Sequence, residues 1–143
     1  MGYTVRIAAE KASLSPNTLR YYEKEGLLPH IQRSESGIRH YSDEDLEWLS
    51  LVCCLKNTGM SIKQIRDFVN LSLQGPETLN ERCDMLAAHK RSVEKQMEEM
   101  QKYLEKVSHK IAYFTRQYKD YCMEKALACE TQGCCGFESR QPL

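Results

Sequence analysis

The sequence predicts a mainly α-helical protein in which a winged helix-turn-helix module is followed by one long helix. Two observations support this prediction. Paired helix signals and a hairpin signal fill the stretch before residue 42, and apolar residues recur every seven positions between residues 79 and 121. We expect a winged helix-turn-helix domain over residues 1–75, a dimerisation coiled-coil helix over residues 76–121, and a short helix with a flexible, cysteine-containing tail over residues 122–143.

Helix caps predict the helix-turn-helix. Ser15 followed by Pro16 is a favoured N-cap with proline at the first helical position, and Gly26 is a favoured residue directly after a helix. These signals indicate a helix over about residues 16–25. A first helix over about residues 6–12 precedes it, across a tight turn at Ser13-Leu14. Two short helices at this spacing favour the geometry that places the second helix in a DNA major groove.

A wing is predicted directly after the second helix. Leu27-Leu28-Pro29 and Ile38–Tyr41 are two extended runs, and Ser36-Gly37 between them is a turn signal. A hairpin of this kind, placed after a helix-turn-helix, is the feature that defines a winged helix. The predicted wing therefore consists of two arms, one on each side of the Ser36-Gly37 turn.

Three capping boxes predict the helices that follow the wing. Ser42–Asp45 begins a helix that ends before Gly59, and Ser61–Gln64 begins one that ends near Leu73. The third box, Thr78–Glu81, begins the long helix. After residue 121 the apolar pattern weakens, so we expect a separate short helix over residues 122–129.

The long helix shows the alternating four- and three-residue spacing of a coiled-coil seam, sustained for six heptads. A helix of about 43 residues is roughly 65 Å long and leaves this apolar seam bare in a monomer, so it needs a partner, most simply a second copy. Lys90 is the one charged seam position. Either its stem lies along the seam with the ammonium in water, or it fixes the register or the oligomeric state. The apolar seam positions are Leu79, Cys83, Leu86, Val93, Met97, Met100, Leu104, Val107, Ile111, Phe114, Tyr118 and Tyr121.

Charge and composition limit the class of protein. The formal net charge of the 143 residues is zero, which argues against a protein that grips DNA by diffuse positive charge alone. Phosphate contacts must then come from individually placed side chains and helix N-termini. The sequence has no apolar run approaching the ~18 residues of a membrane span and no signal-peptide core, so we expect a cytoplasmic protein without membrane contact. The seven cysteines are then thiols or metal ligands rather than structural disulfides.

Three sequence blocks in the first half of the chain together match the signature of a known protein family. Thr18-Leu19-Arg20-Tyr21-Tyr22-Glu23, Gly26-Leu27-Leu28-Pro29 and Gly37-Ile38-Arg39-His40-Tyr41 resemble the signature of the MerR family of bacterial transcription regulators. The resemblance implies a homodimer in which two long helices pair antiparallel. It also implies binding to a pseudo-palindromic operator in double-stranded promoter DNA. The two elements of such a promoter are set too far apart for RNA polymerase. The sensed state of the regulator would untwist and bend the DNA until polymerase can read both elements, so polymerase is a partner only through the promoter. Ser13 departs from the family, which usually has glycine at this turn; the departure has a modest cost if the site needs a positive φ.

The candidate DNA contacts lie on the second helix and the wing. A hydroxyl or guanidinium on the exposed face of a helix in a groove reaches phosphates or base edges. Tyr22 is assigned to the core because so short a helix must anchor its inner face. For Tyr41, core packing and DNA contact both stay open. The candidates are Thr18, Arg20, Tyr21, Arg39 and Tyr41.

Cys54 is the candidate sensor thiol. On a helical wheel it falls outside the apolar stripe, so its helix does not need it as a buried filler, whereas Cys53 lies at the margin of that stripe. Residues 54–60 and the block His109–Tyr113 resemble the aldehyde- and thiol-stress-sensing subgroup typified by AdhR and NmlR. This resemblance implies that Cys54 senses reactive carbonyls or nitrosative stress, without any cofactor.

A metal sensor is the alternative. Other branches of the family bind metal through cysteines after the dimerisation helix and one at its start, and thiolates suit zinc, copper(I) or mercury. Two observations argue against a metal sensor. Cys83 is a position of the coiled-coil seam, and Cys134 and Cys135 fall in a tail that is poorly preorganised for a metal site. The candidate ligands are Cys83, Cys122, Cys129, Cys134 and Cys135.

Two further classes of protein are disfavoured. The four histidines have no paired carboxylate or Ser/His/Asp spacing, and no glycine loop of the phosphate-binding kind is present, so we do not expect an enzyme. A passive thiol or metal buffer would have no use for a winged helix.

Overall fold

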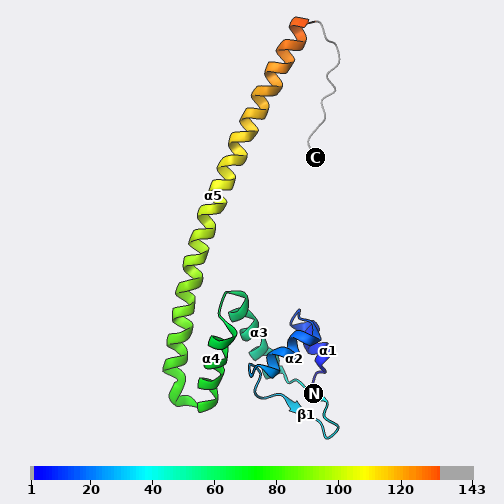
Figure 1. Cartoon of the computed structure of the whole chain (residues 1–143), viewed down its shortest axis with the longest axis vertical. Coiled ribbons are helices and arrows are strands. Elements are labelled where there is room, and N and C mark those ends of the chain that lie inside the picture. Colours follow the sequence, from blue (N-terminus) through cyan, green and yellow to red (C-terminus); the bar gives the residue numbers. More distant parts are fainter. Residues whose placement is uncertain (1, 133–143) are drawn as a thin grey trace. The chain divides into compact units, whose positions relative to one another are not determined.

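The computed structural model describes residues 2–132 of the chain (Figure 1). These residues are mainly helical and include a two-stranded wing, which confirms the predicted fold class. The chain divides into two compact units, Met1–Lys95 and Gln96–Leu143. None of the helices within residues 2–132 is both long and apolar enough to cross a membrane. The elements, in chain order, are α1 (Val5–Lys11), α2 (Pro16–Lys24), β1 (Gln32–Arg33), β2 (Arg39–His40), α3 (Asp43–Asn57), α4 (Ile62–Gln74), the 3₁₀ turn η1 (Pro76–Thr78) and α5 (Leu79–Gln132).

Helices α1 and α2 form the predicted helix-turn-helix. Helix α2 begins after Ser15, whose hydroxyl oxygen accepts the backbone N–H of Thr18 at 3.1 Å, with Pro16 as its first residue. It ends at Lys24, one residue before the predicted end. In the turn between the helices, Ser13 has a φ of 56°, the one positive value among the described residues other than glycine. A serine in this conformation costs roughly 1–2 kcal/mol, which a glycine would avoid.

The wing is present, but its first arm differs from the prediction. Strands β1 and β2 pair antiparallel, and the N–H of Ser34 donates to the carbonyl oxygen of Ile38 at 2.8 Å across the turn. The first arm is therefore Gln32–Arg33 and not Leu27-Leu28-Pro29. Leu27 and Leu28 are buried in the core, because their apolar side chains are better covered there than on a two-stranded ribbon that projects from the domain.

Two of the three predicted capping boxes are formed. The Ser42–Asp45 and Ser61–Gln64 pairs each exchange side-chain and backbone hydrogen bonds, and they begin α3 and α4. The third box is replaced by another arrangement. Thr78 is buried in η1, and its hydroxyl lies 2.5 Å from the carbonyl oxygen of Leu71 and 2.9 Å from that of Gly75. Thr78 thus secures the α4–α5 connection instead of capping α5.

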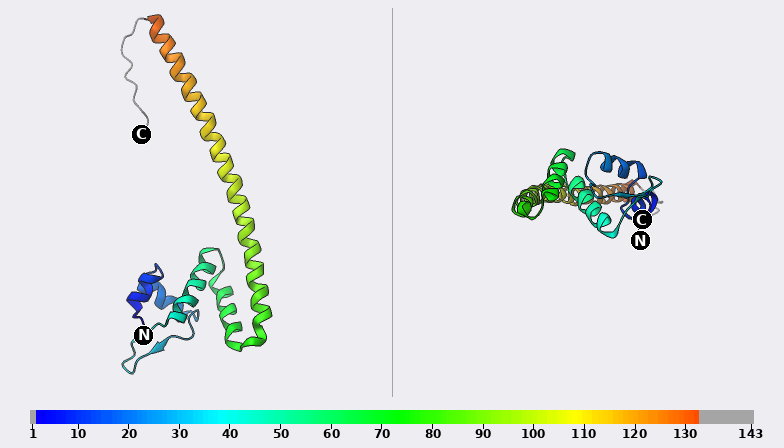
Figure 2. Two further views of the ribbon diagram at one scale, coloured as in Figure 1. Left: turned by 180° about the vertical axis from the view of Figure 1, so that it is seen from behind. Right: turned by 90° about the horizontal axis from the view of Figure 1, so that it is seen from below.

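The core of the first unit joins the helix-turn-helix to α3 and α4, which lie next to each other in both views of Figure 2. The indole N–H of Trp48 on α3 donates to the carbonyl oxygen of Leu27 at 2.9 Å, and its ring stacks on Phe68 of α4 with centroids 5.9 Å apart. Leu86, near the start of α5, packs against this core. This seam position is consequently used within the chain, a role that the heptad pattern did not predict.

Helix α5 is longer than predicted. It runs without a break for 54 residues, from Leu79 to Gln132, or about 80 Å. The separate short helix expected over residues 122–129 is the last part of α5, because residues 123–128 include strong helix formers even though the heptad pattern fades. Residues 133–143, and with them Cys134 and Cys135, lie outside the described part of the chain.

Candidate nucleic-acid interface and sensor thiol

The outer face of α2 presents two of the predicted DNA contacts. Leu19 and Tyr22 are buried on its inner face, as predicted for Tyr22. Arg20 is exposed, with its guanidinium within hydrogen-bond distance of the side-chain oxygen of Asn17 at 3.2 Å, and Tyr21 is 48% exposed. Both side chains are therefore accessible on the face opposite the core.

Thr18 lies at the N-terminus of α2 and is half-buried. Its hydroxyl is 2.8 Å from the hydroxyl of Ser15, the N-cap residue. The first turn of a helix also presents backbone N–H groups that favour anions. Thr18 thus lies beside the N-cap of α2, where its hydroxyl and that of Ser15 are within hydrogen-bond distance.

The two wing candidates have different surroundings. Arg39 of β2 donates from Nε to the carboxylate of Glu23 on α2, and its side chain is 25% exposed. Arg33 of β1 donates to the other oxygen of the same carboxylate at 3.2 Å. Arg39 therefore keeps part of its guanidinium at the surface while it is held against α2.

Tyr41 is fully buried, and this decides the question that the sequence left open in favour of the core. A side chain with no exposed surface cannot contact DNA, so Tyr41 is removed from the candidate interface. Burial is the main cause that raises the pKa of its phenol. Glu23 raises this pKa further, and the nearby guanidinium groups of Arg39, Arg20 and Arg33 lower it. Tyr41 thus packs under the charged groups that join the wing to α2.

The two adjacent cysteines of α3 differ in the way that the helical wheel predicted. Cys54 is exposed. Cys53 is half-buried and packs against the core, and burial raises the pKa of its thiol. A buried thiol is less often ionised at a given pH and reacts more slowly. Cys54 is therefore the more accessible of the two thiols.

A short chain of hydrogen bonds joins the turn that contains Cys54 to α5. The hydroxyl of Thr58 donates to the carbonyl oxygen of Cys54 at 2.7 Å, and the same oxygen accepts the backbone N–H of Thr58 at 3.1 Å. The hydroxyl of Thr58 also lies 2.6 Å from Nε2 of His89 on α5. Thr58 and His89 are 31 positions apart, so no sequence spacing indicates that they meet.

A second contact that sequence reasoning missed joins α4 to the end of α2. Nε of Arg66 donates to the carbonyl oxygen of Glu25 at 2.8 Å, and its guanidinium pairs with the carboxylate of Glu25. Glu25 is the C-cap of α2, so the guanidinium satisfies a carbonyl that the helix leaves without an internal partner. The position of the second helix is thus tied to α4.

The candidate metal ligands are spread along α5. Cys83 is exposed, while Cys122 and Cys129 are half-buried and two helical turns apart. Cys122 is hydrogen-bonded to the phenol of Tyr118 and raises its pKa. Within residues 2–132 of this single chain, no three His, Cys, Asp or Glu side chains gather closely enough to hold a metal ion. The two tail cysteines lie outside those residues.

Comparison with known proteins agrees with this geometry. Residues 3–71 match the family described as MerR HTH family regulatory protein, and residues 46–109 match the description MerR, DNA binding. The chain belongs to the MerR family. An uncharacterized HTH-type transcriptional regulator of Haemophilus influenzae is 44% identical over 116 residues, which cover 81% of this chain and 86% of that protein.

Two named relatives place this MerR-family chain near the predicted subgroup. The crystal structure of HiNmlR, a MerR family regulator lacking the sensor domain and bound to promoter DNA, superposes with a TM-score of 0.77 at 44% identity, covering 81% of this chain and 92% of that one. AdhR of Bacillus subtilis is 39% identical over 79 residues, 55% of this chain and 56% of AdhR. The MerR-family chain is therefore a DNA-binding transcriptional regulator and, like its relatives, not an enzyme.

Proposed function

We propose that this MerR-family chain acts as a homodimer that activates transcription when the Cys54 thiol reacts with an aldehyde or another electrophile. With formaldehyde, the sulfur would form a bond to the carbonyl carbon, and the thiol proton would pass to the carbonyl oxygen to give a hydroxymethyl thioether. The reaction needs no cofactor. The exposed position of Cys54 and the similarity to AdhR and HiNmlR support this proposal.

The observation that carries the proposal is the hydrogen-bonded link from the backbone carbonyl oxygen of Cys54 through the Thr58 hydroxyl to His89. Cys54 lies on α3, which packs against the helix-turn-helix, and His89 lies on α5, the proposed dimerisation helix. An adduct on the Cys54 thiol adds volume and a hydroxyl group to the residue whose backbone carbonyl oxygen begins this link. A change in this turn can therefore shift the DNA-binding elements relative to α5, which is how a small adduct would alter the distortion of promoter DNA.

The test is transcription from a promoter that the protein regulates, in vitro, with and without formaldehyde. Cys54→Ser should fold and bind the operator as the wild type does, but should not respond to formaldehyde. Cys83→Ser, which changes another exposed thiol, is the matched control and should respond. Truncation after Ala128 should also leave the response intact. If truncation abolishes a response to zinc or copper(I) while Cys54→Ser behaves like the wild type, the protein is a metal sensor.

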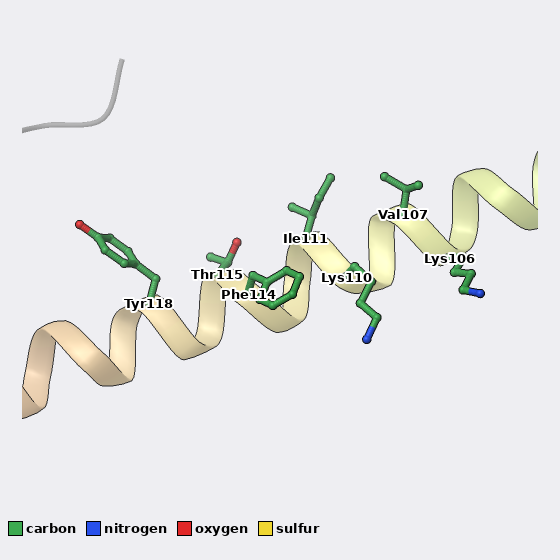
Figure 3. A pocket seen from close by; sticks show the side chains of 7 residues that line it. All are labelled: Lys106, Val107, Lys110, Ile111, Phe114, Thr115 and Tyr118. Carbon is green, nitrogen blue, oxygen red and sulfur yellow. The ribbon is translucent and has the colours of Figure 1, made fainter.

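The proposed dimer rests on the seam of the second unit. Apolar seam side chains from Met97 to Tyr121 are between 54% and 68% exposed in the single chain. In Figure 3, Val107 and Ile111 project from one side of α5, while the amino groups of Lys106 and Lys110 point away from that side. Such an uncovered apolar stripe on a long helix favours pairing with a second copy.

Charge along α5 favours antiparallel pairing. Residues 96–105 contain three acidic and one basic side chain, a net charge of −2, and residues 106–115 contain two lysines and no acid, a net charge of +2. Antiparallel pairing about a two-fold axis between Glu105 and Lys106 places each of these segments beside the oppositely charged one. The same register sets Leu104 against Val107 of the second copy and Met100 against Ile111. Parallel pairing would place like charges together.

We also propose that Thr18, Arg20, Tyr21 and Arg39 contact a pseudo-palindromic operator. The exposed face of α2 and the surface part of the Arg39 guanidinium support this assignment. The two halves of a homodimer would contact the two halves of the operator. RNA polymerase would be affected only through the altered shape of the promoter, with no direct contact required.

A further inference from the structure

The wing holds two arginines in an arrangement that is unfavourable by itself. Arg33 and Arg39 are directly opposite each other in the β1–β2 ladder. Like charges at such a position repel and destabilise a two-stranded ribbon, which is at best marginally stable alone. A third charged group must offset this repulsion if the wing is to keep one position.

Glu23 of α2 supplies that group. One oxygen of its carboxylate accepts from Nη2 of Arg33 at 3.2 Å, and the other accepts from Nε of Arg39. The Glu23 side chain is only 16% exposed, compared with 25% for Arg39 and 50% for Arg33. Water therefore screens these pairs less than ordinary surface ion pairs, and charge-assisted hydrogen bonds of this kind are the stronger ones.

The geometry leaves both arginines able to bind DNA. A guanidinium has five N–H donors, and the carboxylate uses one from each arginine. The remaining donors of Arg33 and Arg39 are available for phosphate oxygens or base edges. Glu23 thus lies on α2, which carries most of the proposed DNA contacts, and it holds two cationic side chains that belong to the wing.

We propose that Glu23 is a positioning residue that sets the wing against α2, so that the arginines discriminate operator DNA from other DNA. A negative charge near DNA opposes binding, so a carboxylate at this place has a cost for affinity. The gain is in specificity, because arginines held in one direction contact only DNA whose backbone and grooves fit that direction. Two free arginines would contact the phosphates of any sequence.

The experiment compares the affinity for two duplexes over a series of salt concentrations. One duplex is selected by the wild-type protein from a random-sequence library, and the other is a scrambled sequence of the same length and composition. Glu23→Gln removes the charge at nearly the same shape. It should bind scrambled DNA more tightly, with a salt slope steeper by up to about 1.8 for two added phosphate contacts, and the ratio of the two affinities should fall at least roughly tenfold.

Two further variants separate position from charge. Glu35→Gln makes the same change of charge in the turn of the wing, so both affinities should rise together and their ratio should stay constant. Glu23→Asp keeps the charge but is one methylene shorter and cannot reach both arginines, so the ratio should fall. Partial unfolding lowers both affinities by the same factor and leaves the ratio unchanged. A wild-type ratio in both Glu23→Asp and Glu23→Gln would overturn the proposal.

Discussion

The dimer proposal predicts that replacing Leu104 and Ile111 by Asp separates the two copies. Both residues are seam positions of the second unit, and their side chains are 58% and 62% exposed in the single chain. Pairing would cover this remaining surface. Aspartate at the same positions removes the apolar contact and places two carboxylates per chain in an otherwise apolar seam.

The magnitude follows from the exposed fraction. Full burial of a leucine or isoleucine side chain contributes about 1.5–3 kcal/mol, and about six-tenths of each side chain is still uncovered before pairing. Four such side chains in a dimer therefore contribute roughly 4–7 kcal/mol, without counting the cost of the buried charges. Since 1.4 kcal/mol is a tenfold change, the dissociation constant of the dimer should rise by about 10³–10⁵.

Sedimentation velocity at micromolar concentration measures this change, and binding to a two-half operator should be lost with the dimer. The matched control is Ala88→Asp with Ala112→Asp, which adds the same charges to exposed positions of α5 outside the seam. Glu98→Lys with Glu99→Lys tests the orientation, because it weakens an antiparallel pair at low salt but leaves a parallel pair nearly unchanged. A wild-type chain that is monomeric at micromolar concentration would refute the reasoning.

Two further predictions concern single side chains of the first unit. Arg20→Ala should bind its operator more weakly by about 1–3 kcal/mol per half-site contact. It should keep the thermal stability of the wild type, because Arg20 is exposed and its side chain bonds to the nearby Asn17. Fluorescence anisotropy measures the operator affinity and thermal unfolding measures the stability, and an unchanged affinity would contradict the assignment of Arg20 to the interface. Cys54 should react with iodoacetamide faster than Cys53 near pH 8, because burial raises the pKa of Cys53 and so lowers its thiolate fraction. The difference between the two rates should narrow as the pH rises through the raised pKa of Cys53. Peptide mapping by mass spectrometry measures both rates, and equal rates at pH 8 would contradict the difference in burial.

Local signals explain which parts of the fold were predictable from the sequence. The caps at Ser15, Ser42 and Ser61 act within three residues of the helix that they begin, so the sequence alone predicts those helix starts. The exposed position of Cys54 follows from helical periodicity, which is also local. By contrast, the first arm of the wing depended on where Leu27 is buried, and burial depends on the whole core.

The contacts that position the candidate interface were not predictable for a related reason. Glu23 and Arg39 are 16 positions apart, and Glu25 and Arg66 are 41 apart, so no sequence spacing indicates that they meet. Charged residues of this kind are equally compatible with a solvated surface. Only the packing of α2 against the wing and α4 selects these pairs from the many that the composition allows.

Trp48 is the only tryptophan of the chain, and its indole lies where α3, α4 and the segment after α2 meet. Its ultraviolet emission depends on the indole environment, so it reports the integrity of the first unit and carries no signal from the solvent-exposed stretch of α5. Far-ultraviolet circular dichroism, in contrast, is dominated by the 54 residues of α5. The two optical signals together therefore distinguish loss of the DNA-binding module from separation and fraying of the long helix, without any added label.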